Sequence, residues 1–156
     1  MNLPYRKSPR LKKYNYANDG YYFVTLCAHN KNHLFGDISS LNEMGEIAIT
    51  KLEDISAHFS NVRIDKYAIM PNHIHCILVI GCGAKAERSR PFPTVSAVVG
   101  LYKSGVSRLI HASNPQITVW QKSFYDHIIR DESDYLRIWQ YIDENPAKWK
   151  EDEYFC

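Results

Sequence analysis

At residues 67–80 the chain reads Tyr67-Ala68-Ile69-Met70-Pro71-Asn72-His73-Ile74-His75-Cys76-Ile77-Leu78-Val79-Ile80. The second half of this stretch is an apolar, β-branched run, which is typical of a buried strand. Residues two apart in a strand point to the same face, so His73 and His75 leave the sheet side by side. Neutral imidazole is the commonest metal ligand in proteins. The stretch therefore predicts half of a metal site, and the other ligands must come from elsewhere in the chain.

Composition limits the class of protein. The 156 residues fit one domain, residues 1–156, with a core of its own. No segment approaches the ~20 apolar residues that cross a bilayer, and the polar N-terminus lacks an apolar signal region. The four cysteines show no CxxC spacing, which argues against a zinc knuckle or a disulfide framework. We expect a cytoplasmic protein with reduced thiols and no membrane partner.

The N-terminal residues 1–16 form a basic arm that precedes the first predicted element. Tyrosines accompany its cations, which are Arg6, Lys7, Arg10, Lys12 and Lys13. Basic side chains bind phosphates and aromatic faces stack on unpaired bases, so the arm is a candidate DNA-binding element. A solvated tail explains such a terminus equally well. The DNA-binding interpretation of the arm becomes the stronger one only if the rest of the chain also indicates nucleic-acid binding.

Periodicity and turn residues predict strands at 21–28, 62–70, 73–80 and 124–129, and helices at 42–57, 94–109 and 131–145. Thr94 is the expected N-cap of the middle helix, and Pro146 stops the last one. The order β-α-β-β-α-β with an added C-terminal helix predicts an α+β fold of the ferredoxin-like (RRM-like) type with an antiparallel sheet. We expect the histidines on the face that the first two helices leave open, with the last helix nearby.

The last predicted helix supplies candidates for the rest of the site. Its packed stripe follows helical spacing and consists of Tyr135, Ile138, Trp139 and Ile142. Tyr141 and Asn145 lie one turn apart on the flank of that stripe, where side chains are half exposed. The amide oxygen of Asn145 suits a hard cation such as Mg²⁺ or Mn²⁺. If Asn145 is a metal ligand, Tyr141 lies one helical turn away from the metal site.

These residues predict a chemistry. A divalent ion polarises a phosphodiester, and a tyrosine oxygen that attacks the phosphorus becomes a covalent phosphotyrosine. Free tyrosine has a pKa of about 10, so it needs the metal, a nearby cation or a base to lose its proton. The sequence leaves open which of these acts on Tyr141.

Successive blocks of the chain match one family. They are Arg10-Leu11-Lys12, Tyr21-Tyr22-Phe23-Val24-Thr25, Met70-Pro71-Asn72-His73-Ile74-His75, Tyr125-Asp126-His127-Ile128-Ile129-Arg130 and Tyr141-Ile142-Asp143-Glu144-Asn145-Pro146-Ala147-Lys148-Trp149. Over nearly its whole length the chain resembles the HUH single-tyrosine transposases, specifically the REP-associated tyrosine transposases among the insertion-sequence-200-like enzymes. A single block is weakly specific. The histidine pair after Met-Pro-Asn, followed at a distance by Tyr-x-x-x-Asn-Pro, is distinctive.

The resemblance implies that His73, His75 and Asn145 hold Mg²⁺ or Mn²⁺. It implies that Tyr141 cuts single-stranded DNA, leaving a 5′-phosphotyrosine link and a free 3′-OH. Relatives of this subgroup act on repetitive extragenic palindromes (REPs) that fold into hairpins. Relatives differ in oligomeric state, so a monomer and a homodimer both stay open, as does action of the tyrosine helix in its own subunit or in its partner.

Other residues have competing interpretations. Tyr125 is the rival nucleophile, and we prefer Tyr141 because Asn145 lies one helical turn away. His127, Arg130 and Lys103 are candidate DNA contacts, although structural roles explain the first two equally well. The acidic run at residues 151–153 should repel DNA, and we expect it to face away from the site.

The leading hypothesis is a metal-dependent transposase that cleaves and rejoins hairpin-forming single-stranded DNA. The alternative is a catalytically silent relative that binds DNA or RNA on the same fold. A third interpretation is a replication-type nickase, which has the same histidine pair and a tyrosine helix. The absence of a helicase domain from this sequence argues against that interpretation. A denaturant-resistant protein–DNA adduct separates the enzyme from the silent binder.

Overall fold

The computed structural model describes residues 20–81 and 93–156, so the basic arm at 1–16 and Cys82 lie outside the described residues. The sheet has four strands in the order β4-β5-β1-β6, and every neighbouring pair is antiparallel. Its strands are β1 (Gly20–Cys27), β4 (Val62–Ile69), β5 (His73–Ile80) and β6 (Tyr125–Ile129). The three cysteines within the described ranges are free thiols.

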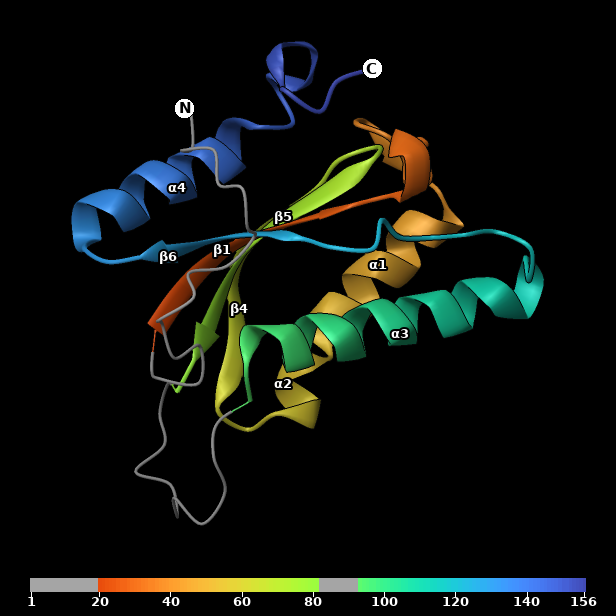
Figure 1. Cartoon of the computed structure of the whole chain (residues 1–156). Helices are drawn as coiled ribbons and strands as arrows, with labels where there is room; N and C mark the ends of the chain where they lie inside the picture. The colour runs from red at the N-terminus through yellow and green to blue at the C-terminus, as the bar shows by residue number, and fades with distance from the viewer. Residues whose placement is uncertain (1–19, 82–92) are drawn as a thin grey trace.

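Helices cover both faces of this sheet. One face carries α1 (Glu43–Glu53), α2 (Ile55–His58) and α3 (Val95–Ser113), and the other carries α4 (Glu132–Glu144) (Figure 1). The predicted α+β class with an antiparallel sheet is confirmed, and the main elements follow one another in the predicted order. None of the helices in the described ranges is long and apolar enough to span a membrane.

Local signals set most element boundaries. Thr94 caps α3 as predicted, because its Oγ1 accepts a hydrogen bond from the backbone N–H of Ala97 at 3.1 Å. The predicted helix at 42–57 is instead two helices that meet at Asp54. The sequence pattern also missed four short elements, namely η1 (His29–Lys31), β2 (Gly36–Asp37), β3 (Ser40–Leu41) and η2 (Trp149–Glu151).

The histidine strand β5 is buried on both faces, which explains its continuous apolar run. Its even-numbered residues, from Ile74 to Ile80, join the core beneath α1 and α3. Ile77 and Val79 join a second core under α4, so His73 and His75 project to the α4 side as well. The predicted proximity of the last helix to the histidines is therefore confirmed.

The face that carries the histidines is covered, so the expectation of an open face is wrong. His73 is 0% and His75 is 1% exposed. Residues 149–156, here called the C-terminal segment, fold back over the two imidazoles. The rings of Trp149 and Tyr154 pack against His73 at a tilt of 35°, and Tyr154 meets His75 edge to face.

The packed stripe of α4 is also narrower than expected. Ile138 and Ile142 are buried, whereas Trp139 remains 37% exposed at the edge of the helix. Its ring lies 4.0 Å from the ammonium of Lys66, a cation–π contact that keeps one ring face covered while the other meets solvent.

Ile138→Ala is expected to lower the free energy of unfolding by about 2–5 kcal/mol, because Ile138 is fully buried between α4 and the sheet. Leu136→Ala is the matched control, since Leu136 on the same helix is 56% exposed and should change stability by less than about 0.5 kcal/mol. Urea denaturation of both variants measures the difference. Equal effects would mean that α4 is not docked on the sheet as described.

Candidate metal and nucleophile site

The two imidazoles at the start of β5 are oriented for a shared cation. Their Nε2 atoms lie 3.0 Å apart, and the ring centroids are 4.5 Å apart. Two ligands bound about 2.1 Å from one ion, at about 90° to each other, would lie about 3.0 Å apart. The nitrogen separation therefore fits a single divalent ion held by His73 and His75.

Hydrogen bonds to the other ring nitrogens hold both imidazoles in place. Nδ1 of His73 donates to Oδ1 of Asn72 at 2.7 Å, and Nδ1 of His75 bonds to Oγ1 of Thr25 at 2.8 Å. An amide oxygen only accepts, so the Nδ1 of His73 carries the proton and its Nε2 presents a lone pair. Metal-binding histidines are typically oriented in this way. Asn72 and Thr25 were missed by sequence reasoning as site residues, and Thr25 is found only from the register that pairs it with His75.

Asp152 contributes a carboxylate to the site. Its Oδ2 lies 3.8 Å from Nε2 of His73 and 3.9 Å from Nε2 of His75, and its side chain is fully buried. The expectation that residues 151–153 face away from the site is therefore wrong for Asp152. The carboxylate is buried because it accepts hydrogen bonds from Nδ2 of Asn145 at 2.5 Å and from the backbone N–H of Tyr154 at 2.7 Å. Together His73, His75 and Asp152 form a group that could hold a metal ion.

Asn145 reaches the same cluster from the C-terminal end of α4, where it is the C-cap residue and 3% exposed. Its Nδ2 donates to Asp152, while its Oδ1 is buried and accepts no hydrogen bond from the described residues. A buried carbonyl oxygen without a donor is unfavourable. This oxygen is therefore a fitting donor for a hard cation, which would satisfy it.

Tyr141 lies one turn before Asn145 on α4. Its ring centroid is 5.4 Å from that of His75 and 6.0 Å from that of Phe23. Burial raises the pKa of Tyr141, and the carboxylates of Asp152 and Glu153 raise it further. The phenol is thus protonated in this arrangement.

The rival tyrosine, Tyr125, faces the same side of the sheet. Its ring centroid is 6.3 Å from that of Phe23, and both belong to the core under α4. Tyr125 is on β6 and Tyr141 is on α4, so the two hydroxyl groups reach this region from different elements.

His73 and Asp152 have the protonation states that metal binding requires. Burial lowers the pKa of His73 and the neighbouring His75 lowers it further, so the imidazole is neutral near pH 7. Burial by itself raises the pKa of Asp152, but His75, Asn145 and the backbone N–H of Tyr154 outweigh burial and hold the pKa below its ordinary value. Neutral imidazoles and an ionised carboxylate are the ligand forms of these groups.

The C-terminal segment covers this site on the side that faces away from the sheet. The ring of Tyr154 lies 4.6 Å from that of His73 at an interplanar angle of 35°, and the ring of Trp149 lies 5.8 Å from it. Asn72 anchors the segment, because its Nδ2 donates to the carbonyl of Tyr154 at 2.8 Å. In this conformation the segment shields both imidazoles from solvent.

A cavity of about 330 Å³ lies beside the C-terminal half of α4. Tyr141 and Asn145 line it, together with Arg137, Gln140, Glu144, Lys148 and Glu151. The candidate nucleophile therefore borders an open space whose rim carries two cations and two carboxylates.

Lys103, a predicted DNA contact, has a structural role in this conformation. It lies on α3, on the opposite side of the sheet, where its ammonium donates to the carbonyls of Gln121 and Ser123 at 2.9 and 3.0 Å. Burial lowers the pKa of Lys103. The structure does not bring it to the histidine cluster, and the predicted contacts of the arm at 1–16 lie outside the described residues.

His127 and Arg130, the other predicted DNA contacts, lie on β6 and just after it. Nε2 of His127 bonds to Oδ2 of Asp134 at 2.7 Å, and Arg137 also contacts the carboxylate of Asp134. Burial alone raises the pKa of Asp134, but the hydrogen bonds from His127 and Arg137 outweigh it and lower the pKa. Arg130 is exposed where α4 begins.

Comparison with known proteins identifies the family. Residues 16–145 match the family model described as "Transposase IS200 like". An uncharacterized protein of Haemophilus influenzae is 38% identical, over 98% of this chain and 94% of its own length. The REP-associated tyrosine transposase of Escherichia coli is 25% identical, over 85% of this chain and 70% of that protein.

Solved structures share the fold. A REP-associated tyrosine transposase bound to a REP hairpin superposes with a TM-score of 0.61 at 18% identity, covering 90% of this chain and 74% of that one. A putative transposase from Deinococcus radiodurans gives a TM-score of 0.54 at 15% identity, covering 86% of this chain and 95% of that one. Since the family model spans most of the chain, including the histidine pair and Tyr141, the protein belongs to the IS200-like transposase family.

Proposed function

We propose that this transposase cleaves and rejoins single-stranded DNA next to a hairpin, with Tyr141 as nucleophile and a divalent cation bound by His73 and His75. The observation that carries the proposal is the paired Nε2 atoms, 3.0 Å apart, with the ring of Tyr141 packed 5.4 Å from that of His75. The side chains that we propose as nucleophile and as two metal ligands thus lie on one face of the sheet.

In the cleavage step the oxygen of Tyr141 attacks a phosphorus of the DNA backbone. A bond forms between that oxygen and phosphorus, and the bond from phosphorus to the 3′-oxygen breaks. The phenolic proton passes to a base or to solvent, and the departing 3′-oxygen takes up a proton to become a free hydroxyl. The 5′-phosphate stays on Tyr141, and attack by a 3′-hydroxyl reverses the step and rejoins a strand.

Mg²⁺ or Mn²⁺ fits the donors of this chain, which are two imidazole nitrogens, the buried Oδ1 of Asn145 and the carboxylate of Asp152. Such an ion would polarise the scissile phosphate and stabilise the charge that develops on its oxygens. We propose His73, His75 and Asn145 as ligands in the DNA-bound protein. Asp152 is then the group that substrate oxygens replace.

Hairpin-forming single-stranded DNA is the proposed substrate. The Escherichia coli relative is named for its association with REPs, and the similar solved structure holds a REP hairpin. The cavity beside Tyr141 supports a strand that enters next to α4, because Tyr141 and Asn145 both line it. Its cations Arg137 and Lys148 are paired with Asp134 and Glu144 and would have to exchange these partners for phosphates.

Covalent capture tests the proposal. The purified protein is incubated with Mn²⁺ and oligonucleotides that carry palindromes from the DNA flanking its gene, alongside hairpins with randomised tails. We expect a denaturant-resistant adduct that EDTA prevents. Binding of the hairpins without any adduct would contradict the proposed chemistry and favour the catalytically silent DNA-binding protein, a reading that the burial of both imidazoles also supports.

Thr25→Val is expected to weaken Mn²⁺ binding by about 10- to 100-fold, because it removes the hydroxyl that orients His75 while it keeps the shape of the side chain. Isothermal titration calorimetry measures the affinity. Thr50→Val is the matched control, since Thr50 is an exposed residue of α1. An unchanged affinity in Thr25→Val would show that the hydroxyl does not orient a metal ligand.

A further inference from the structure

A second cavity, also of about 330 Å³, lies at the opposite end of α4 from the histidine cluster. It is lined by Tyr21, Ile129, Arg130, Asp131, Glu132 and Tyr135. We propose that this cavity binds one unpaired nucleobase of the DNA strand, stacked on the ring of Tyr21. The proposal extends the proposed function, because it takes single-stranded DNA as the substrate.

The walls of the cavity are aromatic and held in place before any ligand binds. The rings of Tyr21 and Tyr135 meet edge to face with centroids 5.7 Å apart, and the hydroxyl of Tyr135 donates to the carboxylate of Asp65. The guanidinium of Arg63 lies 5.9 Å from the centroid of the Tyr21 ring. Tyr21 nevertheless remains 37% exposed, so part of its ring is available to a partner. Aromatic faces of this kind stack on unpaired bases.

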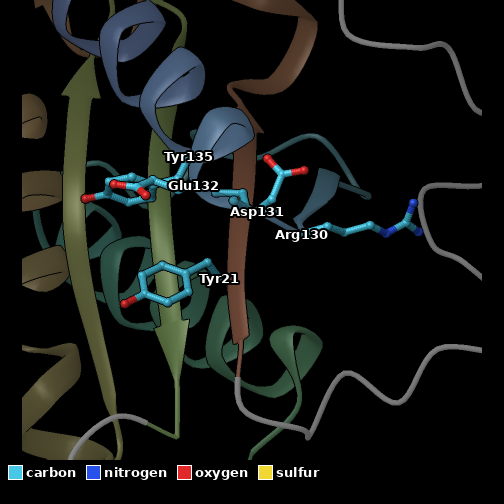
Figure 2. A pocket seen from close by; sticks show the side chains of 6 residues that line it. Tyr21, Arg130, Asp131, Glu132 and Tyr135 are labelled. Atoms are coloured by element: carbon cyan, nitrogen blue, oxygen red, sulfur yellow. The ribbon is translucent and has the colours of Figure 1, made fainter.

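The charges at the rim select the base over the phosphate. Asp131 and Glu132 carry carboxylates at the start of α4, and Figure 2 shows Arg130 extending away from the two tyrosine rings. Two carboxylates repel a phosphate, whereas they accept hydrogen bonds from the exocyclic amino groups of adenine, cytosine and guanine. The cavity therefore suits a base with an amino group better than it suits thymine.

The cavity lies within reach of a strand held at the catalytic site. Tyr21 and Thr25 are four positions apart on β1, which is about 13 Å, and Thr25 pairs with His75. Tyr135 and Tyr141 are six positions apart on α4, which is about 9 Å. At about 3.4 Å per stacked nucleotide, and more when the strand is stretched, these spans correspond to about two to four nucleotides. The base that binds would thus lie a few positions from the scissile phosphate.

Fluorescence of 2-aminopurine, an adenine analogue that loses emission on stacking, tests the proposal. The probe is placed in turn at each unpaired position beside a hairpin, and binding is measured in EDTA with the Tyr141→Phe protein, so that no cleavage intervenes. We expect quenching at one position, about two to four nucleotides from the phosphate that Tyr141 attacks in the wild-type protein. Tyr21→Ala should remove this quenching and weaken binding by about 5- to 150-fold.

Two further variants separate stacking from a loss of fold. Tyr21→Leu keeps apolar volume without a π face and should behave like Tyr21→Ala, whereas Tyr21→Trp should retain the quenching. An abasic site at the quenched position should weaken binding as much as Tyr21→Ala, and the two changes together should cost no more than either one. Additive losses, or quenching that persists in Tyr21→Leu, would overturn the proposal.

The outcome is independent of the cleavage chemistry. Adduct formation by the wild-type protein without any Tyr21-dependent quenching would reject the base site and leave the transposase chemistry standing. Tyr21-dependent quenching without any adduct would support the base site and reject the proposed chemistry.

Discussion

Tyr141→Phe is expected to reduce covalent capture of hairpin DNA to undetectable levels. The change removes one oxygen and keeps the ring that packs against His75 and Phe23, so the fold and DNA affinity should persist. Without a phenolic oxygen the chain has no nucleophile at this point of α4. Denaturing gels with labelled DNA measure the adduct, and a gel-shift assay measures binding.

Tyr125→Phe is the matched control, because Tyr125 packs against the same Phe23 from β6. It should keep most of the adduct. Mass spectrometry of the DNA-linked peptide should find the modification on Tyr141. An adduct that survives in Tyr141→Phe and disappears in Tyr125→Phe would assign the nucleophile to Tyr125 instead.

Ending the chain after Glu151 is expected to raise the rate of adduct formation by at least about ten-fold. The C-terminal segment stacks Tyr154 on His73 and places the Asp152 carboxylate 3.8 Å from its Nε2. The scissile phosphate can reach the imidazoles only in molecules in which these contacts are broken, so their removal increases the competent fraction. Single-turnover kinetics in Mn²⁺ measure the change.

Asp152→Asn separates the two roles of the segment, because it keeps the aromatic cover and removes the charge. If the carboxylate blocks the substrate, this variant should also gain rate, although less than the shortened chain. If Asp152 is a required ligand, both variants should lose Mn²⁺ affinity and adduct. That second result would contradict our proposal that substrate oxygens replace Asp152 in the DNA-bound protein.

The sequence predicted the strands of the sheet well where an apolar run and a turn signal mark the same boundary. The bounds of β5 follow from an apolar run that begins directly after Pro71-Asn72, a pair that forces a turn. The break at Asp54 was missed because the apolar spacing continues across it from Leu52 to Ile55. Periodicity reports which side of a helix is buried, and it is insensitive to a short interruption of the backbone.

The site was predictable only in part, and the reason is physical. His73 and His75 share a face because side chains in a strand alternate every two residues. Tyr141 and Asn145 share a face because residues four apart lie one turn apart in a helix, and the sequence displays both spacings directly. Asp152 was misjudged because a carboxylate within an acidic run is ordinarily solvated. Its burial depends on donors from Asn145 and Tyr154, and only the folded chain brings these together.

Asn72 couples the orientation of His73 to the position of the C-terminal segment. Its Oδ1 accepts a hydrogen bond from Nδ1 of His73 and so fixes the proton on that nitrogen. Its Nδ2 donates to the carbonyl of Tyr154 in the C-terminal segment. Replacing Asn72 to loosen the C-terminal segment would therefore also change the orientation of the His73 imidazole. Substitutions of the segment's own side chains, such as Tyr154, can loosen the cover without removing the hydrogen bond to His73.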